Sequence, residues 1–305
     1  MIKKISIIGS GNVGSTLAFS ILNRIPPREL ALVDICPGLA QGVAKDLEDT
    51  RGILKFSTSI KGSSKYTAIK NSDIVVLTAG IPRKKGMTRA DLLKINKEIA
   101  RLTALEIKSL ACNSIVIAVS NPLDVITYTL LKETKFNRNQ VFGMGSSLDT
   151  NRLLNILYKH SKHPIAEMTG CIYGPHNNQM IVDAQQIKIK NKPIAQVFNK
   201  DKIAEIKQKV QYRGAEIVGH LKNRSAHFAP GLSCCSLIEA ICNNADKVIP
   251  VSVYLNGEYG IFDACLGVPC VVNRKGIERI IELKISAREK KELKKAEKAF
   301  KKCMI

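Results

Sequence analysis

The sequence predicts an α/β fold, with a doubly wound parallel-sheet domain at residues 1–145 and a mixed α+β domain at residues 146–305. Two observations predict it. Short apolar runs such as "ELALVDI" and "SIVIAVSNP" alternate with helical patterns in the first half, as expected for parallel strands that helices cover on both faces. Beyond residue 145, strand-like runs continue, but helices no longer alternate with them regularly.

The elements of the first domain follow in order. A strand-like run at residues 2–8 leads into the glycine turn "GSGNVG", after which apolar residues recur at helical spacing. The next predicted elements are strands at residues 29–35, 72–80 and 114–122 and a helix from Thr88 to Leu110. This helix carries an apolar stripe of Leu92, Ile95, Ile99 and Leu102. The polar loop "GIPRKKGMTR" before it contains Gly and Pro, and we expect it to move as a lid.

In the second domain, strands are expected within "EMTGCIYG", "MIVDAQQIKI" and "KVIPVSVYL", and a helix in "GMGSSLDTNRLLNILYKHS". Another predicted helix has an apolar face of Ile203, Ile206, Val210, Ile217 and Leu221. At the C-terminus, Leu293, Ala296, Phe300 and Met304 lie at helical spacing among lysines, which predicts an amphipathic surface helix.

The net charge of +21 raises the question of a nucleic-acid or membrane partner. The lysines are spread along the chain without a nucleic-acid motif, so a nucleic-acid partner is not expected, although a polyanion-binding face stays an alternative. No apolar run approaches the roughly 18 residues of a membrane span, and we expect a cytoplasmic protein without a membrane partner. The nine cysteines form no CxxC pair, which favours buried reduced thiols and no metal site.

The segment "GSGNVG" fits GxGxxG with Gly9, Gly11 and Gly14, and it has the required context. A strand precedes it, a helix follows, and Asp34 ends the second strand twenty residues beyond Gly14. Such glycines let the backbone approach a pyrophosphate at a helix N-terminus. Because Asp34 can bind a ribose diol and would repel a 2′-phosphate, the pattern predicts a Rossmann domain that binds NAD rather than NADP. A purely structural glycine turn or another nucleotide is the alternative.

Three further segments, "TAGIPRKKGMTR", "VSNPLD" and "GMGSSLDTNR", lie where a doubly wound sheet binds its ligands. The residues that they and the second domain bring to one crevice are Arg83, Arg89, Asn121, Asp149, Arg152 and His176. Three arginines, a carboxylate, an amide and a histidine suit a small carboxylate-bearing substrate that undergoes proton-coupled chemistry.

With these motifs the chain resembles the lactate/malate dehydrogenase family over essentially its full length, and most resembles its lactate-dehydrogenase-like malate dehydrogenases. The matching segments are "GSGNVG", "LVDI", "TAGIPRKKGMTRADLLKIN", "VSNPLD", "GMGSSLDTNR", "GPHNNQM", "APG" and "YLNGEYGIFDACLGVPCVV". The resemblance implies an NAD-dependent oxidoreductase that acts on a small dicarboxylate and assembles as a homodimer or homotetramer.

The resemblance also implies residue roles. His176 resembles the general acid and base, and Asp149 the partner that orients its ring and favours imidazolium. Arg152 resembles the bidentate clamp on a substrate carboxylate. Arg89 resembles the group that polarises the carbonyl, and Asn121 a ligand of the substrate oxygen. The implied cofactor contacts are Gly9, Ser10, Gly11, Asn12, Val13, Gly14, Asp34, Thr78, Ala79, Gly80, Asn96, Val119, Ser120 and Asn121.

Arg83 stands six residues before Arg89, where this family tends to have arginine for oxaloacetate and glutamine for pyruvate. Closing the lid over oxaloacetate without a cation would leave a buried charge unpaired, at a cost on the order of several kcal/mol. Malate and oxaloacetate are therefore the expected substrates. The alternatives are lactate or another 2-hydroxyacid, a lid charge at Arg83 that stays in solvent, or a catalytically silent NAD-binding protein with a polyanion-binding surface.

The chain departs from the family at Asn151, before the clamp arginine, and at Asn177, Asn178 and Gln179, after the histidine. Asn tolerates a left-handed backbone better than other non-glycine residues, so we expect Asn177 to keep a turn that glycine usually makes. Asn178 would retain the shape of aspartate without its charge. These departures predict a local geometry that is kept and an electrostatic environment that changes.

Overall fold

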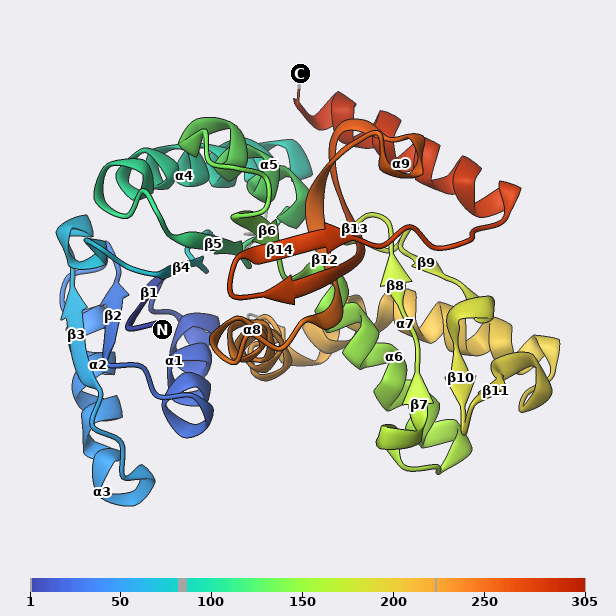
Figure 1. Ribbon diagram of the computed structural model, residues 1–305, viewed down its shortest axis with the longest axis horizontal. Coiled ribbons are helices and arrows are strands. Elements are labelled where there is room, and N and C mark those ends of the chain that lie inside the picture. Colours follow the sequence, from blue (N-terminus) through green and yellow to red (C-terminus); the bar gives the residue numbers. More distant parts are fainter. Residues whose placement is uncertain (1, 82–86, 223, 305) are drawn as a thin grey trace.

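The computed structural model describes residues 2–81, 87–222 and 224–304, and within them a nine-stranded sheet runs through the molecule (Figure 1). Its strand order is β14-β13-β12-β6-β5-β4-β1-β2-β3. The parallel strands are β1 (Lys4–Ile8), β2 (Glu29–Val33), β3 (Ser59–Ser63), β4 (Ile74–Leu77), β5 (Ile115–Ala118) and β6 (Val141–Gly143). The antiparallel strands are β12 (Lys247–Asn256), β13 (Phe262–Asn273) and β14 (Gly276–Ile280).

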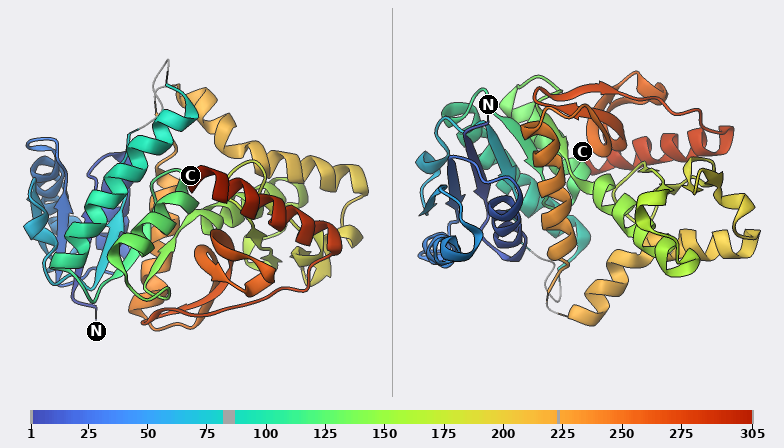
Figure 2. Two further views of the ribbon diagram at one scale, coloured as in Figure 1. Left: turned by 90° about the horizontal axis from the view of Figure 1, so that it is seen from above. Right: turned by 60° about the horizontal axis from the view of Figure 1, so that its bottom comes forward.

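Helices cover both faces of the parallel part (Figures 1 and 2). On one face lie α1 (Asn12–Arg24), α2 (Leu39–Asp49) and α8 (Phe228–Cys242), and on the other α4 (Arg89–Leu110) and α5 (Leu123–Thr134). The short α3 (Arg51–Leu54) and η1 (Tyr66–Ile69) lie in the connections. Strands such as β4, with four buried residues in "IVVL", are apolar throughout because each side of the sheet faces a helix layer.

The remaining elements form a lobe beside the sheet, with an apolar core of its own that contains Leu153, Ile172 and Val210. Its helices are α6 (Gly145–Ser161), α7 (Lys200–Leu221), η2 (Ile165–Glu167), η3 (Ala184–Gln186) and η4 (Ile194–Gln196). Its strands are β7 (Met168–Thr169), β8 (Ile172–Tyr173), β9 (Ile181–Val182), β10 (Lys188–Ile189) and β11 (Lys192–Pro193). The turn η5 (Glu258–Gly260) joins β12 and β13, and the C-terminal helix α9 (Ala287–Met304) packs on β13 and α5.

The predicted fold class is confirmed, with one difference in how the second part is joined. Ser252 of β12 pairs with Gly143 of β6, so the sheet of the first part continues into the second. The strand from Phe262 to Asn273, β13, was not among the predicted strands. The segments "EMTGCIYG" and "MIVDAQQIKI" form only two-residue strands, because turns and short helical segments interrupt them.

The apolar stripe expected on the 88–110 helix is not its buried face. Ile95 is 37% exposed and Leu102 is 50% exposed. The buried positions of α4 include Ala100, Ala104 and Ile107, and the two alanines let this helix approach α5 and the sheet closely. Similarly, Ile206 and Val210 of α7 are buried, but Leu221 at its end is exposed.

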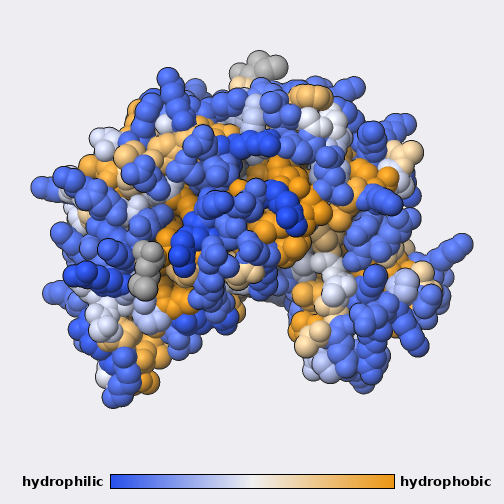
Figure 3. Space-filling view, in the orientation of Figure 1, coloured by the Kyte–Doolittle hydropathy of each residue, from blue (hydrophilic) through white to orange (hydrophobic). Residues whose placement is uncertain are grey.

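The cysteines were expected to be buried, but only some of them are. Among them Cys234, Cys235, Cys265 and Cys270 are buried, Cys171 and Cys242 are half-buried, and Cys36, Cys112 and Cys303 are exposed. In the described part of the chain, no helix is long and apolar enough to cross a membrane. The face shown in Figure 3 is mostly hydrophilic, in keeping with 47 Lys and Arg residues in the chain.

Candidate active site

The three glycines of the turn between β1 and α1 have different roles: one has a positive φ, one makes a close contact and one faces open space. Gly9 has a φ of +104°, which favours glycine, and a Cβ at Gly14 would lie 1.9 Å from the Gly9 carbonyl oxygen. A Cβ at Gly11, by contrast, would meet nothing within 4 Å. Gly11 is the N-cap of α1, whose first amide groups and dipole favour an anion there. The buried Ser10 Oγ has no partner in the described structure, so the turn fits a pyrophosphate group.

Asp34 follows β2 at the same edge of the sheet and is held by this turn. Its Oδ2 accepts a hydrogen bond from the Ser10 amide at 2.7 Å, and its Oδ1 accepts one from the Cys36 amide at 2.9 Å. The carboxylate is therefore fixed next to the turn while each oxygen keeps a free lone pair. This arrangement fits a ribose diol beside the pyrophosphate site.

A crevice of about 340 Å³ opens between the glycine turn and the second part of the chain. Its lining includes predicted site residues: Val13, Thr78, Gly80, Asn96, Val119, Ser120, Asn121 and His176. The Asn96 amide does not point freely into it, because Oδ1 accepts from the Ile81 amide at 2.9 Å and Nδ2 donates to the Asn121 carbonyl at 2.7 Å. Asn96 thus joins the start of the 80–89 loop to the "VSNP" segment.

Other residues that line the crevice were not predicted from the sequence: Ile81, Leu92, Met144, Leu148, Ser225, Ala226 and Pro230. They are mostly apolar, and five of them (Ile81, Leu92, Met144, Leu148 and Pro230) lie within segments that match the family, but their residue types do not separate them from core residues. Leu92 belongs to the predicted apolar stripe of α4, so part of that stripe faces the crevice.

Three predicted residues come together at the centre of the site. The Oδ2 atom of Asp149 lies 2.6 Å from His176 Nδ1, and its Oδ1 accepts from Arg152 Nη1 at 3.1 Å. Asp149 is fully buried, and the Arg152 Nε atom is buried without a partner in the described structure. Both Asp149 and Arg152 lie on α6, three residues apart and hence on one face. The loop that carries His176 packs on Gly145, where a Cβ would lie 2.8 Å from His176 Cγ.

The electrostatics of this cluster favour a protonated imidazole. Burial alone lowers the pKa of His176, and Arg152 opposes its charge, but the charge and hydrogen bond of Asp149 and the charge of Asp124 outweigh both. The net result is a raised pKa. Because Nδ1 is bonded to Asp149, Nε2 is the ring nitrogen that can exchange a proton with a ligand.

Two of the predicted arginines cannot be placed in this cluster. Arg83 lies outside the described residues, as does half of the predicted lid. Arg89 begins α4, whose N-cap Thr88 forms a capping box with Asp91, and its side chain is outside the described part. Asn121 lies at the crevice with an exposed side chain.

The expectation of a left-handed backbone at Asn177 is wrong, because Asn177 is absent from the residues with positive φ. The turn is made in another way. The Asn177 side-chain Oδ1 accepts from the Gln179 amide at 2.7 Å, and its carbonyl accepts from the Met180 amide at 3.0 Å. Asn178 is exposed, and Asn151 Nδ2 donates to Ser233 Oγ of α8 at 3.0 Å. His176 nevertheless faces Asp149, so the local geometry is kept.

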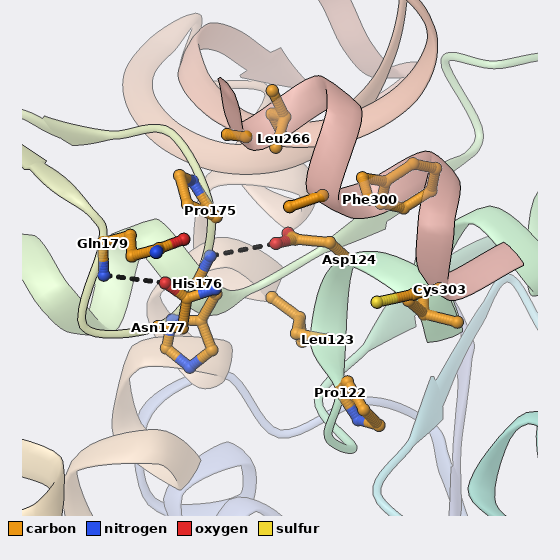
Figure 4. A pocket seen from close by; sticks show the side chains of 13 residues that line it. Pro122, Leu123, Asp124, Pro175, His176, Asn177, Gln179, Leu266, Phe300 and Cys303 are labelled. Atoms are coloured by element: carbon orange, nitrogen blue, oxygen red, sulfur yellow. Dashed lines mark hydrogen bonds between the residues drawn. The ribbon is translucent and has the colours of Figure 1, made fainter. Parts of the chain in front are cut away.

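Sequence reasoning assigned no role to Asp124, whose carboxylate contacts the backbone of His176 (Figure 4). Its Oδ2 accepts from the His176 backbone amide at 2.9 Å, and its Oδ1 accepts from Ser252 Oγ at 2.7 Å. The available signal was its place in "VSNPLD", three residues after Asn121. Within the described residues, no group of three or more His, Cys, Asp or Glu side chains could hold a metal ion.

Comparison with known proteins identifies the family. Residues 3–143 match the family model "lactate/malate dehydrogenase, NAD binding domain", and residues 146–304 match "lactate/malate dehydrogenase, alpha/beta C-terminal domain". A malate dehydrogenase of Staphylococcus epidermidis is 38% identical over 299 residues, which cover 97% of this chain and 95% of the relative.

Solved structures agree. A malate dehydrogenase from Salinibacter ruber matches with a TM-score of 0.93 and 31% identity, over 99% of this chain and 96% of the other. A lactate dehydrogenase from Cryptosporidium parvum, complexed with lactic acid and nicotinamide adenine dinucleotide, matches with a TM-score of 0.95 and 27% identity, over 99% of this chain and 97% of the other. The chain therefore belongs to the lactate/malate dehydrogenase family of NAD-dependent oxidoreductases.

Proposed function

We propose that this protein is an NAD-dependent malate dehydrogenase, which interconverts (S)-malate and oxaloacetate. The observation that carries the chemistry is the buried Asp149 carboxylate, which joins the His176 ring at 2.6 Å and Arg152 at 3.1 Å beside the crevice. A proton donor and a carboxylate-binding cation thus lie side by side, as a 2-hydroxyacid and its 2-oxo acid require.

We assign the roles of His176, Asp149 and Arg152 from these contacts, and those of Arg89 and Asn121 from the family resemblance. His176 donates a proton from Nε2 to the ketone oxygen during reduction and takes it back during oxidation, and Asp149 holds the ring through Nδ1. Arg152 binds the carboxylate next to the ketone, for which its buried, unpartnered Nε supplies a free donor. Arg89 polarises the ketone, and Asn121 binds the same oxygen.

The residues that would hold NAD are those of the glycine turn, with Gly9 to Gly14 at the pyrophosphate and Asp34 at the adenosine ribose. The wall of the crevice that leads toward His176 contains Thr78, Gly80, Asn96, Val119 and Ser120. We include Ala79, between Thr78 and Gly80, as a further cofactor contact. NAD supplies or accepts the hydride when bound. We also propose the domain division at residues 145 and 146, which is supported by family models that end at residue 143 and begin at residue 146.

The substrate assignment rests on Arg83 and on the relatives. Arg83 would pair with the second carboxylate of oxaloacetate, and the relatives at 38% identity are named malate dehydrogenase. Lactate dehydrogenase is the second candidate, because the lactate and malate dehydrogenases of Cryptosporidium parvum match this structure with the same TM-score of 0.95. A catalytically silent polyanion-binding protein is disfavoured, because polyanion binding does not require the buried pair of His176 and Asp149.

The deciding experiment compares NADH oxidation by the purified protein with oxaloacetate and with pyruvate. We expect kcat/KM to favour oxaloacetate by about a thousandfold, since a charge left unpaired in the closed site costs several kcal/mol. In Arg83→Gln this preference should collapse while NADH binding is retained, and Lys84→Gln is the control on the same loop. A preference of the wild type for pyruvate would reject the malate assignment.

We further propose a homodimer or homotetramer, and a cytoplasmic location that rests on the sequence alone. The assembly is supported by exposed apolar side chains that gather over α1, α2 and α8, where Phe19, Phe228 and Leu232 border one shared hollow. Light scattering coupled to size-exclusion chromatography measures the mass of the assembly. Phe228→Asp, which puts a charge on this surface, should release monomers.

A further inference from the structure

The rear side of the His176 loop is held by a second carboxylate, that of Asp124. Asp124 accepts from the His176 backbone amide with one oxygen and from Ser252 Oγ with the other. These partners come from a loop 52 residues away and from strand β12, 128 residues away. Figure 4 shows the carboxylate reaching the His176 backbone from the start of α5. The Asp124 side chain therefore links three segments that are distant in the sequence, next to the backbone of the proposed acid-base group.

Asp124 is surrounded mainly by apolar side chains. It lines a hollow of about 170 Å³ between α5, the His176 loop and α9. The other walls include the apolar side chains of Leu123, Pro175, Leu266 and Phe300 (Figure 4). Because Asp124 is the second residue of α5, the dipole of that helix favours a negative charge there.

We infer that Asp124 is a positioning residue that fixes the His176 backbone from behind and adds a second negative charge in support of the protonated ring. This inference rests on the proposed function, in which His176 exchanges a proton with substrate. In that arrangement the imidazole lies between two carboxylates. Asp149 of α6 bonds the ring itself, and Asp124 of α5 bonds the peptide that carries it.

The charged and titratable groups around this pair are consistent with an electrostatic contribution. Burial and the charge of Asp149 raise the pKa of Asp124, and the net result is a raised pKa. Its hydrogen bonds from Ser252 and from the His176 amide, and the charge of His176, act in the opposite direction and favour the ionised form. Around His176, Asp149 and Asp124 raise its pKa, and Arg152 of α6 lowers it. Among the described residues, two thiols also lie nearby: that of Cys265, whose pKa is raised by burial, and that of Cys303 on α9.

The experiment uses Asp124→Asn in the full-length protein. An Asn oxygen can still accept from the His176 amide, and its NH₂ group can donate to Ser252, so the geometry is kept while the charge is lost. Oxaloacetate reduction needs the protonated ring, so kcat/KM should be constant below the pKa of His176 and fall tenfold per pH unit above it. We expect Asp124→Asn to move this break down by about one pH unit.

Two further variants separate positioning from charge and from general stability. Asp124→Ala removes the acceptor as well, and we expect kcat to fall about 10- to 100-fold with the KM for NADH unchanged. The matched control is Asp73→Asn, because Asp73 also accepts from backbone amides, those of Lys3 and Lys4, but lies at the start of β4. Its pH break should coincide with that of the wild type.

A second readout does not depend on turnover. The five histidines can be titrated by NMR in the cofactor-free protein, with the His176 signal assigned by its loss in His176→Asn. Asp124→Asn should lower the pKa of His176 by the same shift as the kinetic break, and Asp73→Asn should not. If wild type fails to reduce any 2-oxo acid, the proposed function fails while this titration still tests the coupling.

Two results would overturn the inference. One is an Asp124→Asn protein whose pH break and His176 pKa both match the wild type, because Asp124 would then be only a structural tie. The other result concerns Ser252→Ala, the variant to be measured if Asp124→Asn does not fold. Ser252→Ala, which loosens the same carboxylate, should then lower kcat about threefold, and a Ser252→Ala enzyme with unchanged kcat and unchanged His176 pKa would count against the inference.

Discussion

The cofactor turn and the His176 cluster differ in how they are formed. Backbone geometry forms the turn, whereas side-chain hydrogen bonds between distant segments form the cluster. The turn from Gly9 to Gly14 is made of consecutive residues, and its features are backbone features: a positive φ, a contact that excludes a Cβ, and free amides at the start of α1. The His176 cluster is made of side chains from α5, α6, β12 and a loop, joined by hydrogen bonds across as many as 128 residues.

This difference predicts which kind of change damages each region. In the turn, an added methyl group changes the shape of the backbone surface. We therefore expect the free energy of unfolding or the affinity for NADH to fall. In the cluster, replacing a side chain of similar size alters protonation, so the rate should respond while the fold and cofactor affinity remain. The following substitutions test that contrast, beginning with the largest expected effect.

His176→Asn should be the most damaging substitution. Asn can still donate to Asp149, but it cannot exchange a proton near neutral pH, so we expect kcat to fall about 100- to 10,000-fold. NADH affinity, measured by fluorescence titration, should change little because the glycine turn is untouched. Steady-state kinetics with oxaloacetate measure the loss.

His163→Asn is the control for this variant, since His163 is a partly exposed histidine near Glu167 and away from the crevice. It should keep wild-type kcat. If His176→Asn retained most of its turnover, the proton would have to come from another group, and the cluster would lose its role as the chemical centre.

Gly14→Ala and Gly11→Ala should separate packing from cofactor approach within one turn. A Cβ at Gly14 would press on the Gly9 carbonyl, which is backbone and cannot rotate away, so the free energy of unfolding should drop by about 1–3 kcal/mol. At Gly11 the Cβ meets open space, so unfolding should change by less than about 1 kcal/mol. There the NADH Kd should instead rise about tenfold, because the pyrophosphate needs this approach.

Urea unfolding and NADH titration of both variants provide the test. Equal losses of stability with unchanged NADH affinity would show that Gly11 serves the fold alone, and that the cofactor does not approach the turn at this position.

The two regions also differ in how far the sequence predicts them. Strands β4 and β5 are apolar throughout because they are buried on both faces, and the glycine motif is local, so both are visible in consecutive residues. The pairing of His176 with Asp149 followed from family resemblance, since neither residue has an informative neighbourhood. Asp124 was not assigned a role because a side chain that binds a distant backbone amide leaves no mark on its partner's residue type.

Two misreadings have physical causes as well. Apolar periodicity located the helix at α4, but Ala100 and Ala104 pack inward while Leu102 stays exposed, because close helix packing selects small residues. At Asn177 the expectation considered only the backbone tolerance of asparagine, whereas its side chain forms the turn directly.

Asn177→Ala should have the smallest effect. Removing the Asn177 Oδ1 contact to the Gln179 amide, on an exposed loop, should lower the free energy of unfolding by about 0.5–1 kcal/mol. Because Asp124 and Asp149 hold His176 independently of this turn, kcat should fall less than about threefold. Asn178→Ala, at the exposed neighbouring position, should change neither quantity. A tenfold loss of kcat in Asn177→Ala would mean that the turn, rather than Asp124, sets the position of the ring.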